Sequence, residues 1–264
     1  CWIKHKNLYI LDNIEYKRAT NKEEKMNDTK NIIYFNNVFL DLFTTQNKSL
    51  IKLQNPRMFE SWYQYIKANG SIYLESELKN INIDYKKGYF LYLTGHIGHL
   101  PYMKDDNSIE ECIKITLKIL SKFGNGLPIV IKPHSITDMS VFYKIIKVMN
   151  LKNIHISYLH PAVLSSYAVC AISNYFSSSQ ADANFIGATT IEYTNYSEKA
   201  IRLTKNKSAN PPYIDYFINN DEGKLTSIIK NLVKKNIKNK PVKTINDNFE
   251  NNIEYKKNIS NIIF

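Results

Sequence analysis

Four short segments hold the side chains of this sequence that are best suited to chemistry. They are residues 94–99 (TGHIGH), 132–135 (KPHS), 160–161 (HP) and 173–179 (SNYFSSS). Imidazole, ammonium and hydroxyl groups donate hydrogen bonds to phosphate oxygens, and a neutral imidazole also takes up a proton near neutral pH. These residue types predict a site for a phosphate-bearing ligand with acid–base groups beside it.

In the first two segments, polar side chains lie next to a glycine or a proline, which changes the flexibility of the backbone. In residues 94–99, Gly95 would let the backbone approach a ligand, and His96 and His99 could donate to phosphate or transfer a proton. A glycine turn with two solvated histidines is the alternative. In residues 132–135 a proline stiffens the loop. The groups that this loop offers to a diphosphate or phosphodiester belong to Lys132, His134 and Ser135.

The other two segments each lead into a predicted helix. His160 lies at a strand-to-helix turn, where it either caps the helix or contacts the ligand. His155 and His160 suggest a metal site, but His155 falls within a predicted strand and no third ligand has matching spacing. We therefore predict no metal and read His155 as structural.

The hydroxyl-rich turn at 177–179 could hold a phosphate, because free backbone N–H groups converge at a helix amino terminus. Simple helix capping is the alternative for Ser177, Ser178 and Ser179. Glu192, near the end of a predicted strand, could accept hydrogen bonds from a ribose diol or pair with a lysine. Neither a Walker loop nor a Gly-x-Gly-x-x-Gly fingerprint occurs, and the missing Gly-x-Ser-x-Gly elbow argues against a Ser-His-Asp hydrolase.

The elements that would position these residues form a regular pattern from residue 89 onward. Short apolar runs alternate with helix-length segments, which is typical of a parallel sheet with crossover helices. The predicted strands are 89–94, 127–131, 154–157, 167–172 and 189–193. The predicted helices are 108–123, opened by a Ser-x-x-Glu capping box at 108–111, then 138–149, a short helix near 161, and 180–186.

The fold class is therefore α/β, with a Rossmann-like parallel sheet and a smaller or incomplete N-terminal region. Ligands of such sheets bind beyond the carboxyl ends of the strands, where the four segments are expected. We predict three regions. Residues 1–88 are part of another domain or a connector, residues 89–220 form the Rossmann-like domain, and residues 221–264 hold an amphipathic helix and a basic tail.

Composition narrows the class of protein. The chain has 264 residues, 44% of them hydrophobic, and a formal charge of +11. This charge suits nucleic acid, anionic lipid, a sugar nucleotide or an acidic glycan. Because arginine, which reads bases and phosphates best, occurs only at Arg18, Arg57 and Arg202, we do not expect nucleic acid as a partner.

Location can also be predicted from composition. Three widely spaced cysteines indicate a reducing cytoplasm and no disulfide framework. No run approaches the roughly 20 apolar residues of a spanning helix. Lysines and aromatics in the tail would favour peripheral contact with the anionic inner face of the cytoplasmic membrane. The start at Cys1, without a methionine, indicates a fragment.

The order KPHS at 132–135, SSS at 177–179 and then 187–193 resembles the carboxy-terminal half of bacterial capsule and lipopolysaccharide glycosyltransferases with a GT-B-like fold. The nearest group uses CMP-activated Kdo or sialic acid. In that group a His-Pro and a Ser-Ser motif contact the cytidine nucleotide, which the resemblance places on His134 and on Ser178 and Ser179. Ser135 stands where the family has proline, and we find no Asp/Glu-Asp/Glu-Gly motif, which supplies the base in that family.

The resemblance implies an inverting, metal-independent transferase without a cofactor. Its partners would be a nucleotide-sugar donor and a glycan or lipid-linked acceptor, with residues 1–88 as a partial acceptor-side domain. Lys132 and His134 would stabilise the departing phosphate, and His96 or His99 would be the base. Two alternatives stay open: a CDP-polyol phosphotransferase of cell-wall polymer synthesis, and non-enzymatic binding of nucleic acid or acidic glycan.

Overall fold

The computed structural model describes residues 8–11, 31–34, 49–52, 60–79, 83–175, 177–208 and 213–236. The chain divides into two compact units. Unit 1 comprises Cys1–Trp62 and Ile245–Phe264, and unit 2 comprises Tyr63–Thr244. In unit 1, the strands β1 (Leu8–Leu11), β2 (Asn31–Tyr34) and β3 (Ser49–Lys52) pair in parallel in that order.

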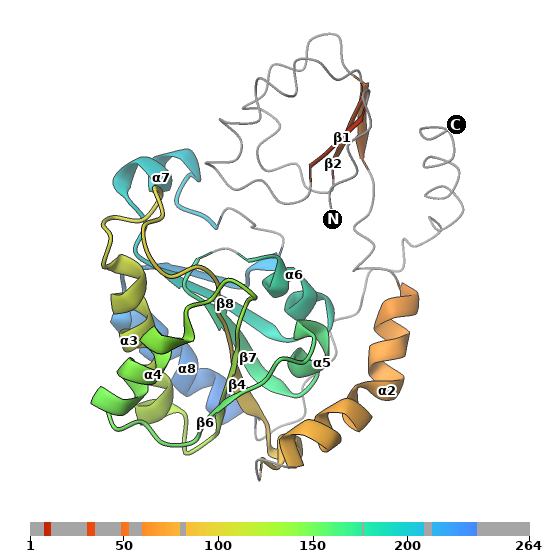
Figure 1. The fold of residues 1–264 in the computed structure, drawn as a ribbon, viewed down its shortest axis with the longest axis vertical. Helices are drawn as coiled ribbons and strands as arrows, with labels where there is room; N and C mark the ends of the chain where they lie inside the picture. Colours follow the sequence, from red (N-terminus) through yellow and green to blue (C-terminus); the bar gives the residue numbers. More distant parts are fainter. Residues whose placement is uncertain are drawn as a thin grey trace. The chain divides into compact units, whose positions relative to one another are not determined.

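Unit 2 is built on a six-stranded parallel sheet with the order β6-β5-β4-β7-β8-β9 (Figure 1). Counted from β4, this is the order 3-2-1-4-5-6 of Rossmann sheets, which confirms the predicted fold class. The strand order reverses between β4 and β7. The strands are β4 (Tyr89–Leu93), β5 (Ile129–Lys132), β6 (Ile154–Ile156), β7 (Ala168–Ser173), β8 (Thr189–Thr194) and β9 (Tyr216–Asn219).

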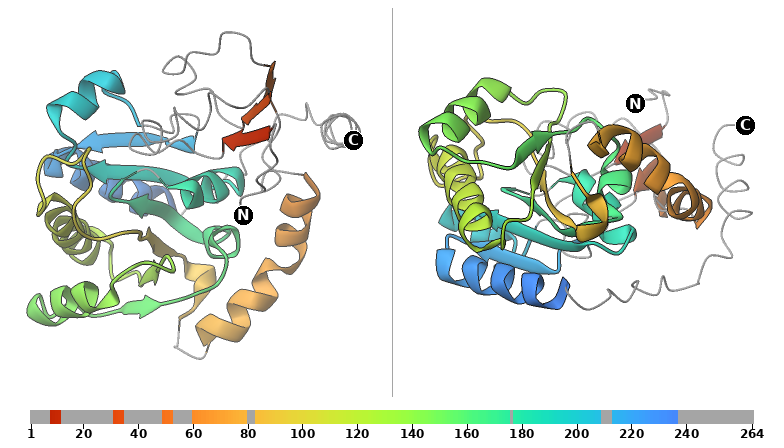
Figure 2. Two further views of the ribbon diagram at one scale, coloured as in Figure 1. Left: turned by 45° about the horizontal axis from the view of Figure 1, so that its top comes forward. Right: turned by 90° about the horizontal axis from the view of Figure 1, so that it is seen from below.

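Helices cover both faces of this sheet (Figures 1 and 2). One face carries α3 (Ser108–Phe123), α4 (Met139–Val148) and α8 (Glu222–Asn236). The other carries α2 (Glu60–Leu78), α5 (Pro161–Ser165) and α6 (Ser178–Phe185). The short helix α7 (Glu198–Leu203) follows β8.

The central strands β4 and β7 are apolar on both faces because helices pack on each side. Every residue of both strands is buried. On β4, the hydroxyl of Tyr89 donates to the carbonyl oxygen of Leu164 in α5, whereas the ring of Tyr92 on the opposite face meets Phe142 of α4 edge-on. The core therefore lies in two layers on either side of β4 and β7.

In unit 2, which begins at Tyr63, α2 packs with Ile66, Leu74 and Leu78 buried. Two features of this unit differ from the sequence predictions. The predicted capping box is wrong, because Asn107 takes the cap position and the Ser108 hydroxyl donates to Asp105 Oδ1 at 2.9 Å. The elements α7 and β9 were not predicted. The predicted tail after residue 241 lies outside the described residues.

Candidate functional site

Thr137 joins the loop after β4 to the loop after β5. Its hydroxyl accepts a hydrogen bond from the backbone N–H of His134 at 3.0 Å and donates to the carbonyl oxygen of Gly95 at 3.0 Å. The hydroxyl of Thr94 lies 2.9 Å from the Thr137 hydroxyl oxygen. The segments TGHIGH and KPHS therefore lie side by side at the carboxyl edge of the sheet. Thr137 was not predicted, because its hydroxyl bonds to Gly95, a residue that only the fold brings close to it.

Gly95 lies beneath Tyr175. A Cβ built on Gly95 would be 1.7 Å from Tyr175 Oη, and the Tyr175 hydroxyl donates to the carbonyl oxygen of His96 at 3.1 Å. Because Gly95 follows β4 and Tyr175 follows β7, this contact spans the point where the strand order reverses. The glycine expected to admit a ligand makes room for Tyr175 in this structure.

The KPHS loop offers one half-buried cation and one exposed imidazole. Lys132 ends β5, and its Nζ donates to the Pro133 carbonyl oxygen at 2.6 Å. Burial lowers the pKa of Lys132, because partial removal from water penalises the charged ammonium. His134 and Ser135 are exposed, with the Ser135 hydroxyl 3.4 Å from His134 Nδ1.

The two histidines of the loop after β4 are exposed. His96 Nε2 lies 3.4 Å from the position that a Cβ on Gly98 would take, and Gly98 has a φ of +134° that favours glycine. His99 Nδ1 lies 2.5 Å from Asp106 Oδ1. Asp106 was not identified from the sequence, because only the path of the loop brings it next to His99.

His160 and Ser177 both cap helices. His160 Nδ1 accepts a hydrogen bond from the Ala162 backbone N–H at 3.2 Å, at the start of α5. Ser177 Oγ accepts one from the Ser179 N–H at 3.3 Å, at the start of α6. Ser178 and Ser179 lie half-buried in the first turn of α6. The capping alternatives are therefore observed, and ligand contact at these residues stays a prediction.

His155 lies within β6, where it is half-buried, and burial lowers its pKa. Across the described ranges, no group of three or more His, Cys, Asp or Glu side chains is arranged to hold a metal ion.

Over the same part of the chain, no helix is long and apolar enough to cross a membrane.

Glu192 is completely buried rather than presented at the sheet edge. Its two carboxyl oxygens accept hydrogen bonds from the hydroxyls of Tyr196 at 2.7 Å and Ser208 at 2.5 Å. These hydroxyls occupy the oxygens that were expected to meet a ribose or a lysine. Burial raises the pKa of Glu192 to about 7, against the lowering effect of the Ser208 and Tyr196 hydrogen bonds.

Asn174 anchors the loop after β7. It is buried, accepts a hydrogen bond from the Tyr92 hydroxyl, and donates to the Tyr193 carbonyl oxygen at 2.8 Å and to Thr116 Oγ1 at 3.1 Å. These bonds hold the base of the loop that carries Tyr175. The signal in the sequence was a pair of polar residues, Ser173 and Asn174, directly after the apolar run 168–172.

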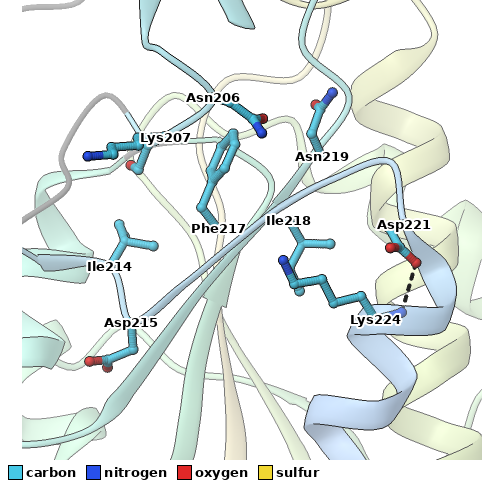
Figure 3. A pocket seen from close by; sticks show the side chains of 10 residues that line it. Asn206, Lys207, Ile214, Asp215, Phe217, Ile218, Asn219, Asp221 and Lys224 are labelled. Atoms are coloured by element: carbon cyan, nitrogen blue, oxygen red, sulfur yellow. Dashed lines mark hydrogen bonds between the residues drawn. The ribbon is translucent and has the colours of Figure 1, made fainter.

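A cavity of about 410 Å³ lies beside the edge strand β9 (Figure 3). Asp215 in its wall accepts a hydrogen bond from the Thr190 N–H at 2.9 Å, and Asp221 accepts one from the Lys224 N–H at 2.8 Å. None of the residues predicted for the site lines this cavity. Its walls are formed by Asn206, Lys207, Ser208, Ile214, Asp215, Phe217, Ile218, Asn219, Asp221 and Lys224.

No protein-family model matches the sequence, and no curated protein matches it. Solved structures are similar at low identity. The wall teichoic acid polymerase TagF has a TM-score of 0.47 and 13% identity over 84% of this chain and 53% of that chain. The calicheamicin glycosyltransferase CalG4 has a TM-score of 0.35 and 10% identity over 83% of this chain and 73% of that chain.

A third solved structure is Thermosulfurimonas dismutans KpsC, a beta Kdo 2,7 transferase, with a TM-score of 0.28 and 12% identity. It matches over 73% of this chain and 79% of that chain. The chain spans about half the length of TagF. At these identities the likeness is confined to the fold.

Proposed function

We propose that this chain is an inverting, metal-independent glycosyltransferase. Its donor is a nucleotide-activated sugar, CMP-linked Kdo or sialic acid, and its acceptor is a bacterial surface polysaccharide or lipooligosaccharide. The observation that carries the proposal is the junction at Thr137, which brings TGHIGH and KPHS together beside the β4–β7 switch point. Ligands of open α/β sheets bind at such a point.

The donor phosphate would meet the loop after β5 and the start of α6. Lys132 loses part of its hydration by burial, so an anion beside it would restore stabilisation to its charged form. His134 is exposed and within the same loop. Ser178 and Ser179 would contribute their hydroxyls at the first turn of α6, where the helix amino terminus favours an anion. These four residues would bind the nucleotide and stabilise its phosphate as it departs.

The transfer step needs a base on the acceptor side. His99 or His96 would remove the proton from an acceptor hydroxyl, and that oxygen would attack the anomeric carbon. The bond from this carbon to the phosphate oxygen breaks, and its electron pair stays with the nucleotide. Attack on the face opposite the leaving phosphate inverts the anomeric centre.

Calorimetric titration with CMP, CDP, UDP and GDP tests the donor assignment. We expect the chain to prefer CMP and His134→Ala to lose that preference, whereas Glu198→Gln, an exposed substitution on α7, should bind as the unsubstituted chain does. A preference for CDP, with a phosphoryl-polyol in the product, would assign the phosphotransferase instead. Binding that depends steeply on salt without nucleotide selectivity would assign non-enzymatic binding.

A further inference from the structure

The loop after β4 holds a histidine–carboxylate pair that the proposed function does not yet use. His99 Nδ1 and Asp106 Oδ1 are 2.5 Å apart, which is hydrogen-bonding distance. We propose that Asp106 is a positioning residue for sugar transfer, which orients the His99 imidazole so that Nε2 accepts the proton of the acceptor hydroxyl. This inference rests on the proposed transferase function and selects His99 over His96 as the base.

The carboxylate determines where the proton of the neutral imidazole lies. An ionised carboxylate only accepts hydrogen bonds, so the hydrogen between the two side chains belongs to His99 Nδ1. In a neutral ring, the lone pair is then on Nε2. A base held by a third group in this way is the arrangement that activates hydroxyl nucleophiles in many transferases and hydrolases.

Asp106 sits on a segment that is firmly attached to the sheet edge. Met103 forms a β-bridge with Tyr196, and the Lys104 backbone N–H donates to the Asn195 carbonyl oxygen at 2.9 Å. The Ser197 N–H donates back to the Tyr102 carbonyl oxygen at 2.9 Å. The carboxylate is therefore carried by backbone anchored to the loop after β8.

A turn directly beside Asp106 adds a second constraint. Asp105 Oδ1 accepts hydrogen bonds from the Asn107 N–H at 3.0 Å and from the Ser108 hydroxyl at 2.9 Å. This turn leads into the first residues of α3. The backbone on both sides of Asp106 is thus held by hydrogen bonds.

The pair is open to an acceptor molecule. The His99 and Asp106 side chains are 66% and 76% exposed. A pair of side chains as exposed as these contributes little to folding stability. A role in folding stability therefore does not explain the pair. A role in orienting the imidazole does, because it would affect the rate of the reaction.

In the proposed step, the acceptor O–H proton moves to His99 Nε2 while the oxygen bonds to the anomeric carbon. The carbon–phosphate oxygen bond breaks and the electron pair leaves with the nucleotide. The imidazolium that results carries one proton on each nitrogen, and Asp106 stabilises its charge. The imidazolium then gives its Nε2 proton to bulk water, which returns His99 to its neutral form.

Kinetics of Asp106 variants test this role. We expect Asp106→Asn to lower kcat by about 100-fold or more, because an amide can donate to Nδ1 and favour the wrong tautomer. The donor KM and CMP affinity should stay within about twofold, because donor binding is assigned to other loops. Asp106→Glu should recover part of kcat, and Glu198→Gln on α7 serves as the matched ion-pair control. A kcat of Asp106→Asn equal to that of the control would overturn the proposal.

The tautomer itself gives a readout that needs no acceptor. Long-range ¹H–¹⁵N correlation spectra should show the His99 proton on Nδ1 in the unsubstituted chain and a shift toward Nε2–H in Asp106→Asn. A neutral His99 with its proton on Nε2 in the unsubstituted chain would defeat the proposal. Failure of CMP binding would instead defeat the proposed function while leaving this measurement intact.

Discussion

The hydroxyl of Tyr175 occupies the space directly over Gly95, so that a Cβ at position 95 would lie 1.7 Å from Tyr175 Oη. The two residues come from the loops on either side of the switch point between β4 and β7. Tyr175 thus lies where the topology predicts a ligand. Any molecule bound there must either contact the phenol ring or displace it.

Gly95→Ala should destabilise unit 2. The added methyl group overlaps the Tyr175 ring, whose Cζ would be 2.7 Å away, and overpacking of this kind costs about 1–3 kcal/mol. Urea unfolding measures the loss. Combining Gly95→Ala with Tyr175→Ala should recover part of the stability that the single alanine at 95 removes.

Gly70 provides the matched control for this substitution. It lies within α2, where an added Cβ meets Ser166 Oγ at 3.5 Å, an ordinary contact. Gly70→Ala should therefore stabilise the helix by about 0.5–1 kcal/mol. Equal effects of the two substitutions would show that Tyr175 does not stay over Gly95 in solution.

Tyr175→Phe should strengthen nucleotide binding if the ring must move to admit the ligand. The substitution removes the hydrogen bond to the His96 carbonyl oxygen, and a typical bond contributes about 1 kcal/mol net. Releasing it would raise CMP affinity about fivefold by calorimetry. Affinity that stays the same or falls would mean that Tyr175 remains in place and its hydroxyl contributes to the bound state.

The central strands could be predicted from the sequence because local pattern and burial agree in them. β4 and β7 are apolar on both faces, and the observed strands begin and end within one residue of the predicted ranges. β9 was missed because its four residues YFIN follow a polar stretch and are only partly buried. α7 was missed because it has only six residues.

Some residues of the candidate site could be predicted from the sequence and others could not, as for the strands and helices. The loops that carry His96, His134 and Ser177 could be predicted, because parallel strands place every following loop at one edge. Thr137 and Asp106 could not, because each acts on a residue brought close by the path of the chain rather than by local periodicity. The partners of Glu192 could not be predicted for a similar reason: Tyr196 and Ser208 reach it only through the fold after β8.

Glu192 should make the stability of unit 2 depend on pH. Its pKa is about 7 in the folded chain, raised by burial from an ordinary value of 4.5. Between these values the folded state retains a proton that the unfolded state has lost. The stabilisation is complete below about pH 4.5 and is lost as the pH rises to about 7, with a total on the order of 3 kcal/mol.

Glu192→Gln tests this dependence, because the amide has similar shape and does not titrate. The variant should gain stability relative to the unsubstituted chain between pH 5 and pH 8, as measured by urea unfolding at both values. Other titrating groups contribute equally to both proteins and cancel in the difference. Parallel stability profiles for the two proteins would mean that Glu192 has an ordinary pKa in the folded chain.

Thr137→Val should separate the two loops that form the proposed donor site. Valine matches threonine in shape but leaves the His134 N–H and the Gly95 carbonyl oxygen without the hydroxyl that joins them. Loss of these bonds in a half-buried position should cost about 1–3 kcal/mol of stability. CMP affinity should also fall, because His134 would no longer be held beside the loop after β4.

Thr204→Val is the matched control, because the Thr204 hydroxyl makes only a local bond of 3.4 Å to the Ile201 carbonyl oxygen at the end of α7. It should change stability and CMP affinity little. If Thr137→Val binds CMP as tightly as Thr204→Val does, the donor site does not depend on the junction between the two loops. A loss confined to Thr137→Val would show that the hydroxyl holds both halves of the site together.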